Sequence, residues 1–451
     1  MRRIFRITAA CLLAALLAPA MAAEPMPDTT SPRAAHGDVE LVQTIDTEGF
    51  GSWTGLRLGD LTGDGQLDFA VAQHEDQDIT CITALNAEGD LLWREGEPHP
   101  DRYSTGFDLP IQIHDFTGDG ASEVVYIANG QIRVLDGATG ELKREGELPA
   151  DNANDCIAFA DLTGRGRAGE VLVKDRYSQI WALDEEFDVL WTYSRGHTVG
   201  HYPWPHDLTG DGHDEVLIGP STLDHQGELL WLAEEGFPED RHSDGTTVAD
   251  LTGDGNPEVI IPACNPELLV YNAEGKLLWM DEIRHAQHAI AGDFRPDLPG
   301  QEVAVLDRDT DRSAEGEDAI IVYDHEGNVI WHEERTDEGV NRWLSVITMV
   351  SDWDDEEGDL ILGYRRGGTT QPTLYDGHGE PVAVFPFPEN PEEQHLAQHG
   401  DIYHDGREEV VVWNENEIRI FTNAALEAEE QDAPREPNEL LYNYTHYIGM
   451  P

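Results

Sequence analysis

Asp60-Leu-Thr-Gly-Asp-Gly-Gln-Leu-Asp68 is a short acidic stretch that the chain repeats along most of its length. Three further copies keep the Gly-Asp-Gly centre and an acidic ninth residue, at 115–123, 207–215 and 250–258. Degenerate copies begin at Asp161, Asp293, Asp352 and Asp401. The first aspartates are spaced about 43 to 59 residues apart, which is typical of a four-stranded propeller blade. The sequence therefore predicts an all-β chain that forms a single β-propeller of eight blades, with seven blades as the alternative.

The repeated stretch carries carboxylates at its first, fifth and ninth positions, a threonine at the third and a glycine at the sixth. Oxygen ligands of this kind suit calcium, and the glycine permits a tight bend. The flanking residues have strand patterns, so we expect calcium-binding loops between the first and second strands of each blade, not EF-hands. The predicted calcium ligands are Asp60, Asp64, Asp68, Asp115, Asp119, Glu123, Asp207, Asp211, Glu215, Asp250, Asp254 and Glu258. In the copy that begins at Asp161, we expect Arg165 to supply positive charge in place of a metal.

Each repeat contains short apolar runs separated by Gly, Asp or Asn turns, which are strand signals. The last repeat supplies only three strands, whereas Val39–Asp46 precedes the first loop with no partner of its own. We expect this N-terminal strand to complete the last blade, so that no sheet edge stays open. One tryptophan follows the turn before the fourth strand in several repeats, and we expect these residues to pack between blades: Trp93, Trp191, Trp231, Trp279 and Trp331.

The ends of the chain differ in composition from the repeats. Residues 1–23 have the basic, apolar and small-residue regions of a secretory signal peptide, and later segments are too short for a membrane span. We therefore expect a secreted or periplasmic protein with a flexible segment at 24–38, a propeller at 39–423 and a tail at 424–451 that docks on it. Three cysteines outside the signal peptide are too widely spaced for a disulfide framework and are predicted to be buried thiols: Cys81, Cys156 and Cys264.

The chain is strongly acidic, with 90 Asp and Glu against 28 Lys and Arg and a formal net charge of -62. This balance argues against nucleic acid and anionic membranes as partners. Such an excess of acidic residues is typical of proteins that stay soluble in a saline habitat. We also expect the protein to be a monomer.

Positive charge and histidine gather in the loops that enter the first strand of a blade and that join its second and third strands. In a propeller these loops share the face opposite the calcium loops. Arginine neutralises carboxylates by paired hydrogen bonds, and His and Tyr transfer protons. These groups meet the needs of β-elimination from a uronic acid. Residues predicted to contact such a substrate are Arg195, His197, Trp204, Arg241, His285, Arg342 and Arg365.

Three alternatives remain open from the residues alone. A non-catalytic binding propeller would use the same face without needing groups that transfer protons. A hydrolase would need paired carboxylates, for which Asp155 and Asp244 are the candidates. A zinc ion is a further alternative at this face, held by ligands from adjacent blades: Cys264, His242, His285 and His288.

The Asp-Leu-Thr-Gly-Asp-Gly loops resemble the FG-GAP/VCBS calcium loops of integrin-type propellers. Together with Gly200-His-Tyr-Pro-Trp204, Arg284-His-Ala-Gln-His288, 294–300 and 444–450, the chain resembles propeller polysaccharide lyases of the rhamnogalacturonan and ulvan lyase group. This resemblance implies elimination across rhamnose–uronic acid linkages of an anionic polysaccharide. It implies proton transfer by His201 and Tyr202, with His242 and His288 as further candidates, and Arg176 or Arg284 at the carboxylate.

Overall fold

The computed structural model describes most of the repeat region, and all of the described residues belong to one compact unit, Pro32–Pro451. The described residues are 39–75, 78–99, 108–196, 199–233, 237, 242–243, 245–263, 267–283, 285–307, 319–334, 346–354, 356–364, 371–387 and 395–426. The predicted signal peptide, the segment 24–38 and residues 427–451 of the predicted tail lie outside them. So do several predicted residues: Cys264, His197, Arg241, Asp244, Arg284, Arg342 and Arg365. Within these ranges, no helix has the length and apolarity needed to cross a membrane.

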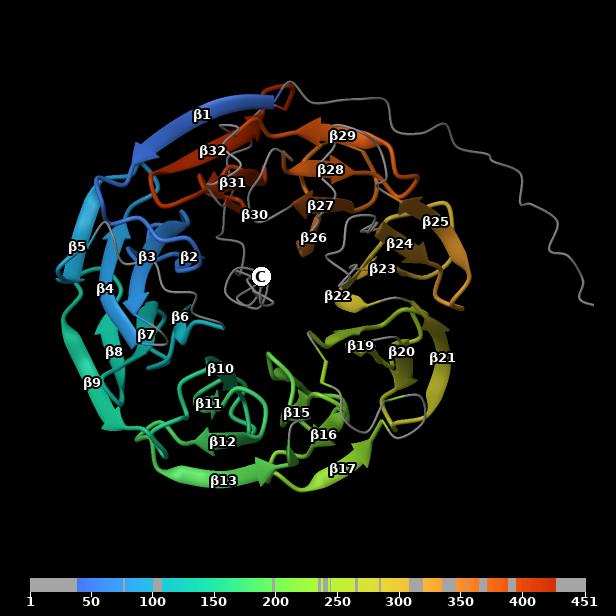
Figure 1. Ribbon diagram of the computed structural model, residues 1–451, viewed down its shortest axis with the longest axis horizontal. Coiled ribbons are helices and arrows are strands. Elements are labelled where there is room, and N and C mark those ends of the chain that lie inside the picture. Colours follow the sequence, from blue (N-terminus) through green and yellow to red (C-terminus); the bar gives the residue numbers. More distant parts are fainter. Residues whose placement is uncertain are drawn as a thin grey trace, which may run out of the picture. The chain divides into compact units, whose positions relative to one another are not determined.

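Eight antiparallel four-stranded sheets form a propeller (Figure 1). The first blade consists of β2 (Leu56–Gly59), β3 (Asp68–Glu75), β4 (Asp78–Leu85) and β5 (Leu91–Gly96), and the second of β6 (Ile111–His114), β7 (Glu123–Ala128), β8 (Gln131–Asp136) and β9 (Leu142–Glu147). The third blade consists of β10 (Cys156–Ala160), β11 (Glu170–Lys174), β12 (Gln179–Leu183) and β13 (Val189–Ser194), and the fourth of β14 (Trp204–His206), β15 (Glu215–Ile218), β16 (Ser221–Leu223) and β17 (Leu229–Leu232). The fifth blade consists of β18 (Thr247–Ala249), β19 (Glu258–Ala263), β20 (Glu267–Asn272) and β21 (Leu277–Glu282), and the sixth of β22 (Ala286–Gly292), β23 (Glu302–Asp307), β24 (Ala319–Tyr323) and β25 (Val329–Glu334). The seventh blade consists of β26 (Val346–Val350), β27 (Leu360–Tyr364), β28 (Thr373–Tyr375) and β29 (Pro381–Val384), and the last of β30 (Leu396–Gly400), β31 (Glu409–Trp413), β32 (Glu417–Asn423) and β1 (Val39–Asp46).

The ring is closed by the N-terminal strand, as the sequence predicts. β1 pairs antiparallel with β32, so that Val39 lies opposite Asn423 and Asp46 opposite Glu417. Figure 1 shows the blue β1 along the outside of the red strands of the last blade. This pairing gives β32 neighbours on both sides and makes β1 the outermost strand, so that the first and last parts of the propeller share one blade. The eight-bladed prediction is confirmed, and the seven-bladed alternative is wrong.

The core lies between successive blades. In the third blade, for example, the inner strands β10 and β11 are buried throughout and mostly apolar, whereas the outermost strand β13 has only half-buried and exposed residues. One cluster joins the second and third blades through Phe116, Val125, Phe159 and Val173. Burial on both faces requires this near-continuous apolar sequence in the inner strands. Cys81 and Cys156 are buried free thiols, as predicted.

The outer-strand tryptophans pack on the next blade, which confirms their predicted role. Trp191 donates its indole N–H to the carbonyl of His225 at 3.1 Å, and Trp279 donates to the carbonyl of His325 at 3.2 Å. Each ring also lies against the glycine two residues further along that turn. Each indole thus adds a hydrogen bond to the apolar contact between neighbouring blades.

Candidate functional site

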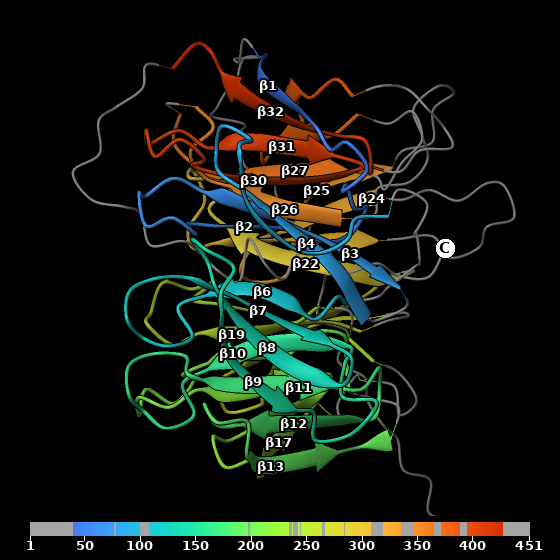
Figure 2. The ribbon, with the colours of Figure 1, turned by 90° about the vertical axis from the view of Figure 1, so that its left-hand side faces the viewer.

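The strands run across the thickness of the ring, so that the loops at their two ends lie on opposite faces (Figure 2). The acidic loops follow the inner strands. The segments that precede the inner strands, together with the loop between β11 and β12, lie at the other ends. Seven residues at this end of the second to fifth blades form one contiguous group, which we call the central cluster: Asp108, Asp155, Lys174, Arg176, Tyr177, His201 and His242.

A buried Asp–His pair lies at one side of the central cluster. His201 Nδ1 is 2.7 Å from Asp108 Oδ2, and neither side chain is accessible to solvent. Burial opposes ionisation of the carboxyl group, but the charge and hydrogen bond of His201, together with Arg176 and Lys174, lower the pKa of Asp108 to about 2. Asp108 is therefore anionic at neutral pH.

A buried ion pair forms the second part of the central cluster. Lys174 Nζ donates to Asp155 Oδ2 at 2.8 Å and to the carbonyl of Arg176 at 3.1 Å. Burial disfavours the ammonium ion, but Asp155 and Asp108 more than offset this effect and raise the pKa of Lys174. Burial also raises the pKa of Asp155 against the opposing charge of Lys174.

Arg176 connects the two pairs and reaches the surface. Its Nη1 lies 3.4 Å from Asp108 Oδ2 and 3.4 Å from Asp155 Oδ1, and its side chain is 24% exposed. Its guanidinium carbon lies 5.0 Å from the centre of the Tyr177 ring. Arg176 is therefore held in place by two carboxylates and an aromatic ring while part of it remains accessible.

Three rings meet beside Arg176. The ring centres of Tyr177 and His242 are 4.8 Å apart, those of His201 and His242 are 5.2 Å apart, and those of Tyr177 and His201 are 5.4 Å apart. Tyr177 and His242 are half-buried, whereas His201 is fully buried. Groups that can transfer protons therefore adjoin a fixed guanidinium, with Tyr177 and His242 on the accessible side.

Tyr202 and Arg57 lie in the interior near the central cluster. Burial raises the pKa of Tyr202 far above its usual value, and its ring contacts Cys156. Arg57 donates hydrogen bonds to four backbone carbonyls, those of Ile111, Thr54, Leu56 and Leu109. Arg57, Lys174 and Arg176 bring three positive charges to this part of a strongly acidic protein, where they balance the carboxylates of Asp108, Asp155 and Asp175.

The structure thus brings together His201, His242 and Arg176, with Tyr202 in the interior beside them. A β-bridge joins Tyr202 to Gly245, and a Cβ atom on Gly245 would lie 3.5 Å from the ring of His288, so His288 is close by. Other predicted residues are less closely associated. Arg195 is exposed at the end of the outermost strand of its blade, and Trp204 is half-buried at the start of β14. His285 is buried, and its backbone N–H donates to Asp307.

Three members of the central cluster, Asp108, Lys174 and Tyr177, were not among the site residues predicted from the sequence. Asp108 is 93 residues from His201 along the chain, so no local spacing indicates the pair. Tyr177 directly follows Arg176, which was the one available signal.

The acidic loops hold their carboxylates with backbone amides. In the first loop, Asp60 accepts from the N–H groups of Gly63, Asp64 and Gly65, and Asp68 Oδ2 accepts from those at positions 61 and 62. Asp68 Oδ1 is buried and accepts no hydrogen bond from any residue that the structure describes. An unsatisfied carboxylate oxygen of this kind fits a cation ligand. No described loop, however, brings its first, fifth and ninth carboxylates together within 4.8 Å.

Basic side chains pair with carboxylates of four of these loops, including Arg295 with Asp297 and Arg407 with Asp405. Arg165 pairs with Glu170 and with Glu185, which confirms that this copy carries its own positive charge. In the second loop, Lys143 Nζ lies 2.5 Å from Glu123 and 3.4 Å from Asp119. This lysine was not predicted to pair with the loop. The predicted calcium loops are thus not equivalent, because Lys143 occupies the carboxylates of one of them.

Comparisons with known proteins agree on the fold. No family model matches the chain, and no curated protein matches it. Among solved structures, a rhamnogalacturonan lyase of Bacillus licheniformis has a TM-score of 0.60 and 19% identity, covering 87% of this chain and 76% of its own. An exotype rhamnogalacturonan lyase has a TM-score of 0.59 and 18% identity, covering 87% and 75%. The biofilm matrix protein Bap1 of V. cholerae has a TM-score of 0.62 and 14% identity, covering 90% and 94%. At such identities the likeness shows the propeller fold alone.

Proposed function

We propose that this propeller is a secreted polysaccharide lyase that cleaves anionic, rhamnose-containing polysaccharide of the rhamnogalacturonan or ulvan type by β-elimination. The observation that carries the proposal is the central cluster, where an accessible guanidinium adjoins a tyrosine and two histidines in an otherwise acidic protein. The lyase folds found among the solved structures support the same reaction.

In the proposed mechanism, Arg176 binds the uronate carboxylate, which makes the C5 proton more acidic. His242 and Tyr177 share the two proton transfers. One removes the C5 proton, and the other protonates the glycosidic oxygen as its bond to C4 breaks and a C4–C5 double bond forms. The two transfers leave the number of protons on the enzyme unchanged, and no water is consumed.

His201 and Tyr202 take different roles in this proposal from those that the resemblance implied. Because His201 is fully buried, it acts as a positioning residue that holds the Tyr177 and His242 rings and is itself held by Asp108. Tyr202 is buried with a strongly raised pKa and supports the packing.

Variants of the two accessible proton-transfer groups test the proposal. We expect Tyr177→Phe and His242→Gln each to lower kcat on the cleaved polymer by about 100-fold or more, with melting temperatures close to that of the wild type. Tyr193→Phe is the control, since Tyr193 belongs to the same blade as Tyr177 but shares a hydrogen bond with Ser221 outside the central cluster. Full turnover by both Tyr177→Phe and His242→Gln would exclude the mechanism.

A non-catalytic glycan- or protein-binding propeller is the second candidate. The full burial of His201 favours it, because the histidine to which the resemblance assigned proton transfer does not reach the surface. The fold shared with the biofilm matrix protein Bap1 is consistent with it. A binding protein would retain polymer on a column while releasing no fragments, and Arg176→Gln would weaken retention without any effect on bond cleavage.

A further inference from the structure

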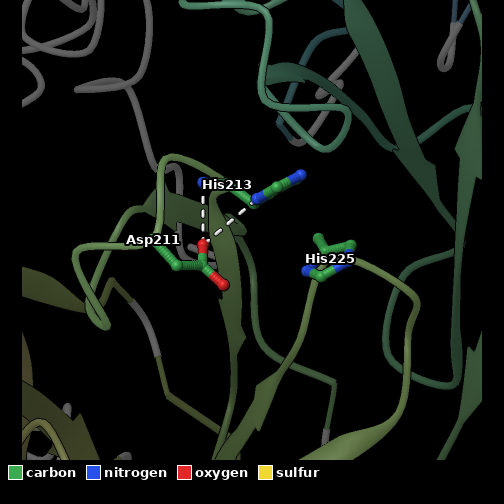
Figure 3. Close-up of side chains that lie close together, drawn as sticks. All are labelled: Asp211, His213 and His225. Atoms are coloured by element: carbon green, nitrogen blue, oxygen red, sulfur yellow. Dashed lines mark hydrogen bonds and ion pairs between the residues drawn. The ribbon is translucent and has the colours of Figure 1, made fainter.

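A second cluster of metal-ligand side chains lies among the acidic loops, away from the central cluster. Asp211 and His213 belong to the loop between β14 and β15, and His225 belongs to the turn between β16 and β17 (Figure 3). One ligand atom from each of these residues lies within 4.8 Å of the other two. Among the described residues, no other three His, Cys, Asp or Glu side chains converge in this way.

The three side chains are already held close to one another. Asp211 Oδ1 accepts from the backbone N–H of His213 at 3.0 Å and lies 3.2 Å from His213 Nδ1. The rings of His213 and His225 are stacked with centres 4.3 Å apart. The backbone of His225 is fixed by the indole N–H of Trp191 from the preceding blade. The loop and the turn are therefore positioned independently of any ligand.

Two imidazoles and one carboxylate are a ligand set that suits zinc better than calcium, because calcium prefers oxygen ligands only. Tetrahedral zinc with bonds of about 2.0 to 2.1 Å holds its ligand atoms about 3.4 Å apart. The side chains must therefore close in by about 1 Å. The exposed fractions of 32% for His213 and 52% for Asp211 leave room for this rotation.

The ligand set is specific to the fourth blade. The position of His213 is occupied by Gln66 in the first blade and by Asn256 in the fifth. The position of His225 is occupied by alanine in both of those blades. The sixth blade has a histidine at the turn position, His325, but Pro299 in the acidic loop.

We propose that Asp211, His213 and His225 bind a zinc-class transition metal, which links the acidic loop of the fourth blade to its outer turn. The metal takes the fifth-position carboxylate that would otherwise be a calcium ligand. It leaves a coordination position for water, since the protein supplies three ligands. This site does not depend on the proposed lyase activity.

Zinc titration by calorimetry tests the site, using untagged protein in excess calcium. We expect His213→Asn and His225→Ala each to weaken binding of one zinc ion by more than about tenfold. Both variants install the residue found in the fifth blade, so they are expected to fold. We also expect zinc to raise the melting temperature of the wild type more than that of either variant.

His325→Ala and His242→Gln are the matched controls, since they remove histidines of the sixth-blade turn and of the central cluster. Both are expected to bind this zinc ion as the wild type does. Wild-type affinity in His213→Asn and His225→Ala would overturn the proposal, as would a wild-type protein that binds no zinc at micromolar concentration. Loss of binding in His242→Gln alone would instead assign the zinc to the central cluster and would also overturn it.

Discussion

At the scale of single residues, the central cluster depends on charges that compensate one another away from water. Asp108 and Lys174 have no solvent-accessible side-chain surface, and Asp155 has almost none. A buried charge of this kind is tolerated only when its partner is present. The cluster is therefore vulnerable to the loss of any one member.

Replacement of Lys174 by methionine would leave Asp155 buried without its closest counter-charge. We expect Lys174→Met to lower the free energy of unfolding by about 3 kcal/mol, measured by urea denaturation. The double variant Lys174→Met/Asp155→Leu should recover much of this loss, because it removes both charges. A double variant less stable than Lys174→Met would contradict this account of the pair.

Glu409 predicts a dependence of stability on pH. It is the ninth residue of the last acidic loop, and burial followed by the charge of Asp405 raises its pKa to about 8. Because the unfolded value is about 4.3, the folded protein binds the extra proton. The stabilisation from this group is complete below about pH 4 and is lost as the pH rises through about 8.

The variant Glu409→Gln keeps acceptor and donor groups for Ile402 N–H and the Thr422 hydroxyl but does not titrate. We expect its free energy of unfolding in chelator to fall less than that of the wild type between pH 5 and pH 9. Denaturant titrations at both values measure this difference. If the free energy of unfolding fell by the same amount between pH 5 and pH 9 in both proteins, Glu409 would have an ordinary pKa in the fold.

At the scale of the element, the turn before each outer strand is fixed by a neighbouring blade. Gly275 has a φ of +79°, and a Cβ atom there would lie 2.5 Å from the ring of Trp231. An alanine would add both backbone strain and a steric clash. We expect Gly275→Ala to lower the free energy of unfolding by about 2 to 4 kcal/mol, measured by denaturation.

Gly130→Ala separates the two contributions. Gly130 has a φ of +75°, but a Cβ atom there would meet nothing within 4 Å. We expect this variant to lose only about 1 to 2 kcal/mol, from strain alone. An equal loss in both variants would show that the contact between Trp231 and Gly275 does not contribute to the packing of neighbouring blades.

The elements were predictable because each repeat signals its own strands and turns. The spacing of the acidic loops gives the eight blades, and the unpaired Val39–Asp46 gives the closing strand. The central cluster was only partly predictable, since its members come from four blades and meet through the curvature of the ring. Arg176 and His242 were found from residue type and loop position, whereas Asp108 has no such signal. Lys143 was missed because it reaches the loop 115–123 from a different strand.

At the scale of the whole molecule, the acidic loops differ from the central cluster, whose carboxylates are paired with Lys174 and Arg176. The chain has a formal net charge of -62, and no Lys or Arg among the described residues pairs with the loops that begin at Asp60, Asp207 and Asp250. Repulsion among uncompensated carboxylates destabilises a compact state. Calcium at the loops that begin at Asp60 and Asp250 would relieve this repulsion, and we propose it as their ligand.

Removal of calcium should therefore lower the melting temperature of the whole ring, because a metal that binds only the folded state stabilises it. We expect excess chelator to lower it by more than about 5 °C and added calcium to restore it, as measured by scanning calorimetry. Added magnesium is the control and should restore less, since it rarely gives up its water ligands. An unchanged melting curve in chelator would rule out the calcium proposal.

The mass of the products released from rhamnogalacturonan and from ulvan tests the central claim most directly. β-Elimination consumes no water, so each new non-reducing end should be an unsaturated uronate, lighter by one water molecule than the corresponding hydrolysis product. The account predicts such fragments from at least one of these polymers, and their release about 100-fold or more slower by the Tyr177→Phe variant. Fragments with hydrated ends would instead indicate a hydrolase, and intact polymer in every case would indicate a binding propeller.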